Sequence, residues 1–162
     1  MTIKRIFSAG GIIIRPSLAT HSAEASRVKK ATEGKQAKPQ WEVLVTQHSG
    51  HKGWDFPKGH REIYESEEQT ALREVKEEVG VKAEIIERVG ETRYFYYEEG
   101  ERVLKTVVFY LMKYKRQRKA STAFEVSAQV WLPIDKVESK LTFKDTKELW
   151  KKAKEKIKHF DI

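Results

Sequence analysis

Cysteine is absent from this chain of 162 residues, which excludes disulfide bonds, thiolate metal sites and a cysteine nucleophile. No apolar run approaches the roughly 20 residues that are needed to span a bilayer. The N-terminal stretch has Arg15 directly after its apolar residues and lacks the layout of a signal peptide. We therefore expect a cytoplasmic protein with no membrane partner.

Positive charge is abundant, since 32 Lys and Arg residues oppose 24 Asp and Glu residues. The net charge of +8 suggests a polyanionic partner such as a nucleotide, phosphate or nucleic acid, with solvated surface lysines as the alternative. Hydrophobic residues make up 39% of the chain, enough for a packed core. The length suits a single domain over residues 1–162.

The pattern of apolar residues predicts an α+β fold, in which helices pack on a mixed sheet. Residues 16–40 lack periodicity and are expected to form a flexible insertion loop. A hairpin turn is expected at residues 98–101, between the fourth and fifth strands. The expected strands are 7–15, 41–46, 83–89, 91–97, 103–114 and 125–132, and a basic turn is expected at 115–120.

Two helices are predicted from their capping signals. The first covers residues 66–79, where Ser66 and Gln69 form a capping box and Gly80 follows as a C-terminal glycine. The second is opened by Asp145 and Glu148, which match a second capping box. Its apolar face is expected to contain Leu149, Trp150, Ala153 and Ile157.

Helical periodicity places three carboxylates of the first helix, Glu74, Glu77 and Glu78, on one face. The neighbouring apolar face, which would dock on the sheet, contains Leu72, Val75 and Val79. Three carboxylates at this spacing repel one another, and Arg73 can neutralise only part of their charge. A hard divalent cation such as Mg²⁺ would neutralise them, whereas the alternative is a solvated acidic helix face.

The spacing around this helix resembles the complete Nudix box. The matching residues are Gly59, Glu65, Arg73, Glu74, Val75, Glu77, Glu78, Gly80 and Val81. The resemblance implies an α/β/α sandwich with a central mixed sheet. It also implies hydrolysis of a nucleoside diphosphate linked to another group, with Mg²⁺ (or Mn²⁺) and an activated water.

The same resemblance suggests roles for single residues. Glu74, Glu77 and Glu78 are similar to the metal ligands of that family, and Gly59 to the glycine whose carbonyl reaches a metal. Arg73 resembles the arginine that positions a catalytic glutamate, and Glu65 a supporting glutamate.

Glu125 is a further candidate for catalysis and metal binding, because it lies six residues before Trp131, as the late glutamate of several Nudix enzymes does. A surface acid at the start of a strand is the alternative. The general base is left open between a glutamate of the box and Glu125.

The segment Gly53-Trp54-Asp55-Phe56-Pro57-Lys58-Gly59-His60 resembles the diadenosine polyphosphate hydrolases and their diphosphoinositol-polyphosphate relatives. Lys58 is a candidate for binding phosphate, and Lys105 is a candidate for a more distal phosphate; exposed lysines are the alternative. Tyr94 and Phe143 are candidates for stacking on a purine, with core packing as the alternative. Strand alternation predicts that one of the pairs Tyr94/Tyr96 and Phe95/Tyr97 is core and the other lines a cleft.

His48, His51 and His60 lack a recognisable zinc spacing, so a loop position or substrate contact is favoured. The leading hypothesis is a Mg²⁺-dependent pyrophosphohydrolase that cleaves diadenosine tetraphosphate to ATP and AMP by attack of water on phosphorus. The alternatives are a hydrolase of other nucleotides, such as oxidised dGTP, or of RNA 5′-ends, and a catalytically silent domain that binds nucleotide or RNA. A monomer or homodimer is expected.

The net charge is unevenly divided along the chain. Residues 59–80 contain seven acids and three bases, a net of −4, so the remainder carries +12. Much of that positive charge lies in the insertion, in residues 113–119 and in the last helix. This division suits a polyanionic substrate that is delivered to a cation-loaded acidic site.

Overall fold

The computed structural model describes residues 2–17, 40–121 and 125–160, and these form a mixed sheet between two helical layers. The strands are β1 (Lys4–Pro16), β2 (Trp41–His48), β3 (Trp54–Asp55), β4 (Lys58–His60), β5 (Val81–Glu98), β6 (Glu101–Gln117) and β7 (Val126–Pro133). Their order is β3-β2-β1-β6-β5, with β4 paired to β1 and β7 to β2. Strands β1 and β6 are parallel, and the other pairs are antiparallel.

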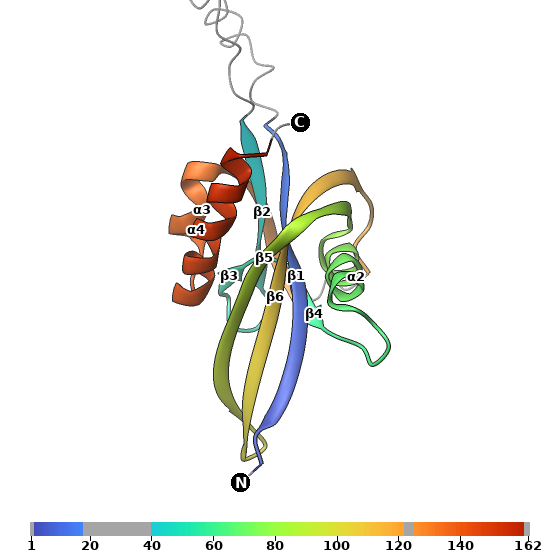
Figure 1. The fold of residues 1–162 in the computed structure, drawn as a ribbon, viewed down its shortest axis with the longest axis vertical. Helices are drawn as coiled ribbons and strands as arrows, with labels where there is room; N and C mark the ends of the chain where they lie inside the picture. Colours follow the sequence, from blue (N-terminus) through green and yellow to red (C-terminus); the bar gives the residue numbers. More distant parts are fainter. Residues whose placement is uncertain (1, 18–39, 122–124, 161–162) are drawn as a thin grey trace, which may run out of the picture.

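Helix α2 (Glu67–Val79) covers one face of the sheet, and α3 (Ile134–Lys140) and α4 (Lys144–Lys158) cover the other (Figure 1). Each face has its own apolar cluster. Val75 and Val79 of α2 pack with Ile13 and Leu44, whereas Trp150 of α4 belongs to the opposite cluster. This arrangement confirms the predicted α+β fold with an α/β/α sandwich. No helix among the described residues is long and apolar enough to cross a membrane.

Helix α2 begins and ends as predicted. The side chain of Ser66 accepts a hydrogen bond from the backbone N–H of Gln69 at 3.1 Å, and the side chain of Gln69 accepts one from Ser66 at 2.9 Å. Gly80 ends the helix with a φ of 69°, a left-handed conformation that glycine adopts without strain. The sequence predicts that Leu72 belongs to the apolar face that docks on the sheet. In the structure Leu72 is exposed, whereas the neighbouring Ala71 is buried.

Strand β5 is a single strand, where the sequence suggested two. Its register against β6 shifts near residues 85–87 and 88–90, so bulges bend the chain without ending the strand. The predicted hairpin turn is confirmed, because Glu99 and Gly100 have φ values of 49° and 79°. The predicted basic turn is shorter than expected, since β6 continues to Gln117.

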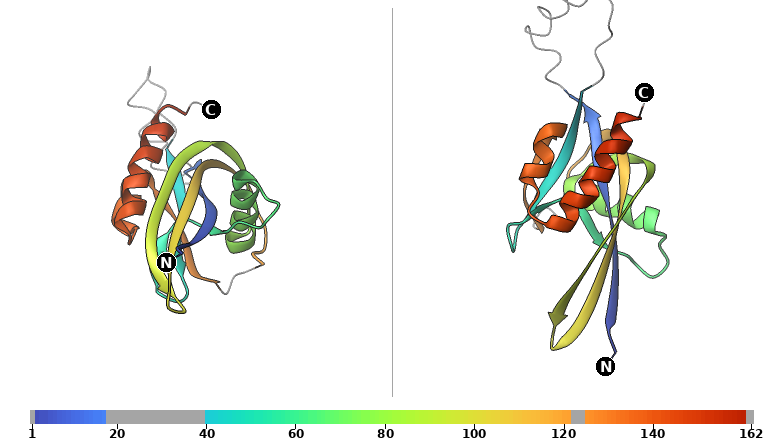
Figure 2. Two further views of the ribbon diagram at one scale, coloured as in Figure 1. Left: turned by 60° about the horizontal axis from the view of Figure 1, so that its bottom comes forward. Right: turned by 60° about the vertical axis from the view of Figure 1, so that its left-hand side comes forward.

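The β5–β6 hairpin projects beyond the helices, together with the start of β1 (Figure 2). None of the described helices covers the sheet there, so the expected core pair of aromatic residues is not found. Phe95 and Tyr97 are 50% and 74% exposed, and Tyr94 is 40% exposed. The prediction was wrong because strand alternation specifies two faces but does not specify whether another layer packs on either of them.

Other parts of the structure also differ from the prediction. The residue that precedes α4 is Phe143, which makes no side-chain cap, and Asp145 lies within the first turn, so the predicted capping box is wrong. The predicted apolar face of α4 is confirmed, because all four of its residues are buried. Helix α3 and the short strands β3 and β4 were not predicted. Most of the predicted insertion, residues 18–39, lies outside the described residues.

Candidate active site

Strand β4 and helix α2 approach each other closely at Gly59. Strand β4 is held by β1, where Gly59 is paired with Ala9. A Cβ atom at Gly59 would overlap with the carboxylate of Glu74, so only glycine fits between β4 and this side chain. The backbone N–H of Lys58 donates to Oε2 of Glu78 at 3.2 Å. The backbone of β4 and two carboxylates of α2 therefore form one compact group.

Arg73 uses all its guanidinium N–H groups within this site. Nε donates to Oε2 of Glu65 at 2.7 Å, and Nη2 donates to Oε1 of the same carboxylate at 2.8 Å. Nη1 donates to Oε1 of Glu74 at 2.7 Å and to Oε2 of Glu77 at 3.1 Å. The remaining bond joins Nη2 to the carbonyl of His60 at 2.9 Å. One cation thus links three carboxylates to the backbone of β4.

The carboxylates differ in how well their charge is compensated. Hydrogen bonds from Arg73 lower the pKa of Glu65 to about 2. Burial raises the pKa of Glu74, although Arg73 opposes the effect. Burial raises the pKa of Glu78 to about 7, because the nearby charge and N–H group of Lys58 offset only part of the desolvation. A cation beside Glu74 and Glu78 would lower the cost of their ionisation.

The donor set fits a hard divalent cation. The carboxylates of Glu74, Glu77 and Glu78 and the backbone of Gly59 supply only oxygen ligands, which Mg²⁺ prefers. Their three negative charges exceed the single charge of Arg73. In the side-chain arrangement described, no three His, Asp or Glu residues of the described ranges converge on one point, and Glu74 and Glu77 are instead held by Arg73.

Glu125 joins this group from a distant part of the sequence. It directly precedes β7, which pairs with β2, and its carbonyl accepts a hydrogen bond from the backbone N–H of Ser49 at 3.1 Å. Glu125 and Glu78 line the same small cavity of about 30 Å³, together with Lys58. The pairing of β2 and β7 thus brings the late glutamate to the acidic helix face.

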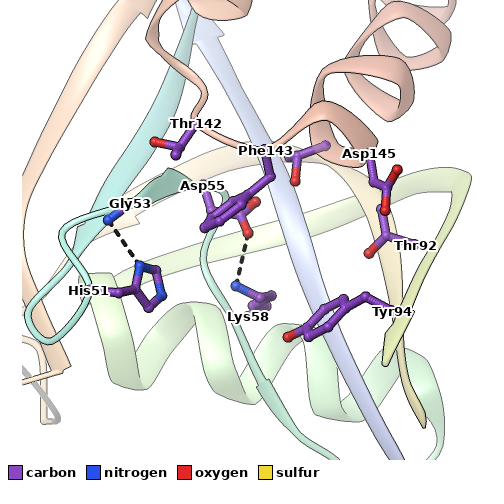
Figure 3. A pocket seen from close by; sticks show the side chains of 10 residues that line it. His51, Gly53, Asp55, Lys58, Thr92, Tyr94, Thr142, Phe143 and Asp145 are labelled. Carbon is purple, nitrogen blue, oxygen red and sulfur yellow. Dashed lines mark hydrogen bonds and ion pairs between the residues drawn. The ribbon is translucent and has the colours of Figure 1, made fainter. Parts of the chain in front are cut away.

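A larger pocket of about 490 Å³ adjoins this small cavity, and the two share His51, Gly53, Asp55 and Lys58. Figure 3 shows the rings of Tyr94 and Phe143 and the ammonium group of Lys58 around the same space. The pocket is lined by His51, Gly53, Asp55, Lys58, Thr92, Tyr94, Thr142, Phe143, Asp145 and Thr146. Both rings are 40% exposed, so each has a surface free to contact a ligand.

The two candidate lysines lie in different settings. Lys58 donates to Oδ2 of Asp55 at 2.9 Å; burial lowers its pKa, but Asp55 outweighs that effect and the pKa is raised. Lys105 pairs with Tyr94 across the β5–β6 hairpin, and its Nζ lies 6.0 Å from the centre of the Tyr94 ring. Burial, and then the charge of Lys58, lower the pKa of Lys105. Lys58 therefore lines both cavities, whereas Lys105 lines neither and lies beside the Tyr94 ring.

The sequence model of the NUDIX domain matches residues 32–154, which is more than half of the chain. The chain belongs to the Nudix hydrolase family. The putative mutator protein MutT4 of Mycobacterium tuberculosis is 38% identical over 104 residues, which cover 64% of this chain and 42% of that protein. A pig bis(5′-nucleosyl)-tetraphosphatase (asymmetrical) is 36% identical over 110 residues, which cover 65% of this chain and 72% of that protein.

The solved structure of a Caenorhabditis elegans Ap4A hydrolase binary complex has the same fold. Its TM-score is 0.69 at 23% identity, and the match covers 96% of this chain and 99% of that one. An RNA pyrophosphohydrolase of Hahella chejuensis is 44% identical, but only over 55 residues, or 34% of each protein. This chain therefore spans less than half the length of two of its curated relatives.

The residues of the Nudix box and the other predicted candidates lie in two adjoining regions. Gly59, Glu65 and the acidic face of α2 surround Arg73, whereas Lys58, Tyr94 and Phe143 line the pocket. The Nζ atom of Lys105 lies 6.0 Å from the centre of the Tyr94 ring. The histidines do not form one cluster: His48 and His51 stack at 4.1 Å, whereas His60 contributes its carbonyl to Arg73.

Sequence reasoning missed several residues that line the pocket, among them Asp55, Thr92, Thr142 and Asp145. Asp55 had a detectable signal, because an acid three residues before Lys58 can form an ion pair with it. Thr142 also had one, because it precedes the candidate Phe143 in a segment that resembles one near the adenine site of the diadenosine polyphosphate hydrolases. Thr92 and Asp145 had none, because they are brought together by the packing of α4 against β5.

Proposed function

We propose that this Nudix domain is a Mg²⁺-dependent (or Mn²⁺-dependent) hydrolase of dinucleoside polyphosphates, with diadenosine tetraphosphate as its main substrate and ATP and AMP as products. The observation that carries the proposal is the continuity of two sites. A pocket with two exposed aromatic rings opens through Lys58 and Asp55 into the small cavity that contains Glu78 and Glu125. The pig tetraphosphatase supports the same substrate class.

The pocket suits one nucleoside of such a substrate. Tyr94 and Phe143 would hold a purine by stacking, which contributes roughly 1–3 kcal/mol per base. The His51 and Phe143 rings make an edge contact, with 5.6 Å between the ring centres, and this contact helps to orient the Phe143 ring. A base in this position places its phosphates toward Lys58, whose charge is already maintained by Asp55.

The phosphates would then lie beside the acidic face of α2. Glu74, Glu77, Glu78, Glu125 and the carbonyl of Gly59 are the proposed metal ligands. A divalent cation bound there supplies charge neutralisation of the phosphate oxygens and lowers the pKa of a bound water. Lys105 is proposed to bind a more distal phosphate. Arg73 keeps Glu74 and Glu77 in position through the 2.7 Å and 3.1 Å hydrogen bonds from Nη1.

Glu125 is proposed as the general base that takes the proton of the attacking water. Glu74 and Glu77 accept hydrogen bonds from Arg73, and Glu78 accepts one from the backbone of Lys58. Among the described residues, no hydrogen bond or ion pair engages the carboxylate of Glu125, so one of its oxygens is free to accept the proton.

The direct test is to incubate the protein with diadenosine tetraphosphate and Mg²⁺ and to separate the products. We expect ATP and AMP in equal amounts, loss of turnover in EDTA and recovery with added Mg²⁺. Glu78→Gln should reduce kcat by at least about 100-fold, and Glu125→Gln should also reduce kcat strongly. No turnover of this substrate at micromolar enzyme would overturn the substrate assignment.

A substrate panel separates this proposal from its alternatives. The panel includes oxidised dGTP and RNA with a 5′-triphosphate. The RNA is included because the similarity to an RNA pyrophosphohydrolase covers 55 residues. We expect kcat/KM for diadenosine tetraphosphate to exceed both. A higher value for either comparison would reassign the substrate. Tight nucleotide binding without hydrolysis of any panel member would instead indicate a silent binding domain.

A further inference from the structure

Four cationic side chains from neighbouring elements surround a hollow beside the C-terminal half of α2. The hollow has a volume of about 380 Å³, and no Asp or Glu of the described residues lines it. A second hollow of about 500 Å³ shares Leu72, Lys82, Ala83 and Arg116 with it. We call the two together the basic groove. Four of its cations are Lys76 of α2, Lys82 of β5, Arg116 of β6 and Arg118, which follows β6, and its second hollow is also lined by Lys115 and Glu84.

Within the described residues, none of these four cations has an acidic partner. Lys115 and Glu84, which both line the second hollow, form an ion pair with each other at 2.7 Å, so the charge of this acid is already neutralised. Arg73 also borders the groove, but its N–H groups are committed to the carboxylates and to the carbonyl of His60. The groove therefore has an uncompensated positive charge.

Two of the cations lie directly opposite each other on neighbouring strands. Lys82 and Arg116 are register partners in the antiparallel β5–β6 pair, so their side chains project on the same face. Like charges directly opposite one another destabilise a sheet. A bound anion would convert this repulsion into two favourable contacts.

Attraction to the negative end of the α2 dipole does not account for the cluster. The carbonyls at this end already have neutral donors: Ser121 N–H donates to Glu77 at 3.0 Å, and the amide of Gln117 donates to Val79 at 2.6 Å. The backbone N–H of Arg118 donates to the carbonyl of Gly80. The cationic side chains are therefore not required as helix caps, and their charges remain available to a ligand.

The lining indicates the class of anion. Among the described residues, no aromatic side chain lines either hollow, so these residues offer nucleobases no stacking surface there. Lysine and arginine together suit phosphate oxygens, and two joined hollows suit a ligand that is longer than one phosphate. We propose that the basic groove binds a linear inorganic polyphosphate chain at a site separate from the catalytic carboxylates.

Isothermal titration of the full chain with a short-chain inorganic polyphosphate, in EDTA, tests the proposal without catalysis. EDTA removes divalent cations, so the acidic site cannot hold the ligand through a bound metal. Lys82→Gln with Arg116→Gln should weaken binding by roughly tenfold or more and reduce its salt dependence. The pair should fold normally, because it removes a cross-strand repulsion, and its turnover of diadenosine tetraphosphate should equal that of the wild type.

The matched control is Lys136→Gln with Lys158→Gln, which removes the same charge from the helices on the opposite face of the sheet (Figure 1). Its affinity should stay within about twofold of the wild type. Equal weakening in both double variants, or unchanged affinity in the groove variant, would overturn the site. Tighter binding of a single-stranded RNA of equal charge, lost in the groove variant, would overturn the choice of ligand.

Discussion

The guanidinium of Arg73 holds the carboxylate of Glu65 through two hydrogen bonds, from Nε at 2.7 Å and from Nη2 at 2.8 Å. This bidentate contact fixes the guanidinium plane, which leaves Nη1 directed at Glu74 and Glu77. Glu65 therefore acts on the proposed metal ligands through Arg73, from a loop eight residues earlier in the chain.

Replacing Arg73 should expose the repulsion that it suppresses. Arg73→Gln leaves three carboxylates without their shared cation, and we expect the free energy of unfolding to fall by about 2–3 kcal/mol. Thermal denaturation with and without Mg²⁺ measures this. Mg²⁺ should restore more stability to the variant than it adds to the wild type. Arg88→Gln, at an exposed residue with a 3.9 Å ion pair, is the control and should change stability little.

Acid should destabilise the fold through Glu65. Its pKa in the folded state is about 2, below its ordinary value of 4.5, so the ionised carboxylate stabilises the protein above about pH 4.5. That contribution is lost as the pH falls from about 5 toward 2. In Glu65→Gln, the urea midpoint should be lower at pH 7 and should depend less on pH in this window. Glu62→Gln removes an equal charge, and a matching effect there would contradict the assignment.

The proposed metal site should not tolerate a methyl group at Gly59. In Gly59→Ala the new Cβ overlaps with the Glu74 carboxylate, which must move away from β4. We expect kcat to fall by about 100-fold with little loss of secondary structure by circular dichroism. In the control, Gly90→Ala, the nearest atom to the new Cβ is Cδ1 of Leu149 at 3.2 Å, and that flexible side chain can yield. Full activity in Gly59→Ala would contradict the proposed site.

Loss of a stacking ring should raise KM more than it lowers kcat. Tyr94→Ala and Phe143→Ala should each raise KM for diadenosine tetraphosphate by roughly tenfold, with a smaller change in kcat. Tyr97→Ala is the matched control, because Tyr97 is on the same strand but is 74% exposed and does not line the pocket. Steady-state kinetics at several substrate concentrations separates the two constants. An equal effect of the Tyr97 variant would argue against stacking.

Local patterns were the part of this protein that could be predicted with most success. The capping box at Ser66, the glycine at residue 80 and the hairpin turn at Gly100 depend on backbone conformations that neighbouring residues set. A second capping box, at Asp145, was wrong, and the other failures include residues whose burial a second layer decides. Leu72 and Phe95 are exposed although each is apolar and fits its local pattern, and the Phe95 ring is covered only in part, by the guanidinium of Arg102 at 4.1 Å.

The sequence by itself determined the acidic face of α2 and its glycine-containing approach strand, because helical periodicity and residue spacing are properties of a short segment. Only the tertiary structure decided which distant residues join them. Pairing of β2 with β7 brings Glu125 to Glu78, and packing of α4 against β5 places Phe143 opposite Tyr94. The register of β5 on β6 places Lys82 directly opposite Arg116. These contacts depend on long-range packing and strand register, which no local pattern encodes.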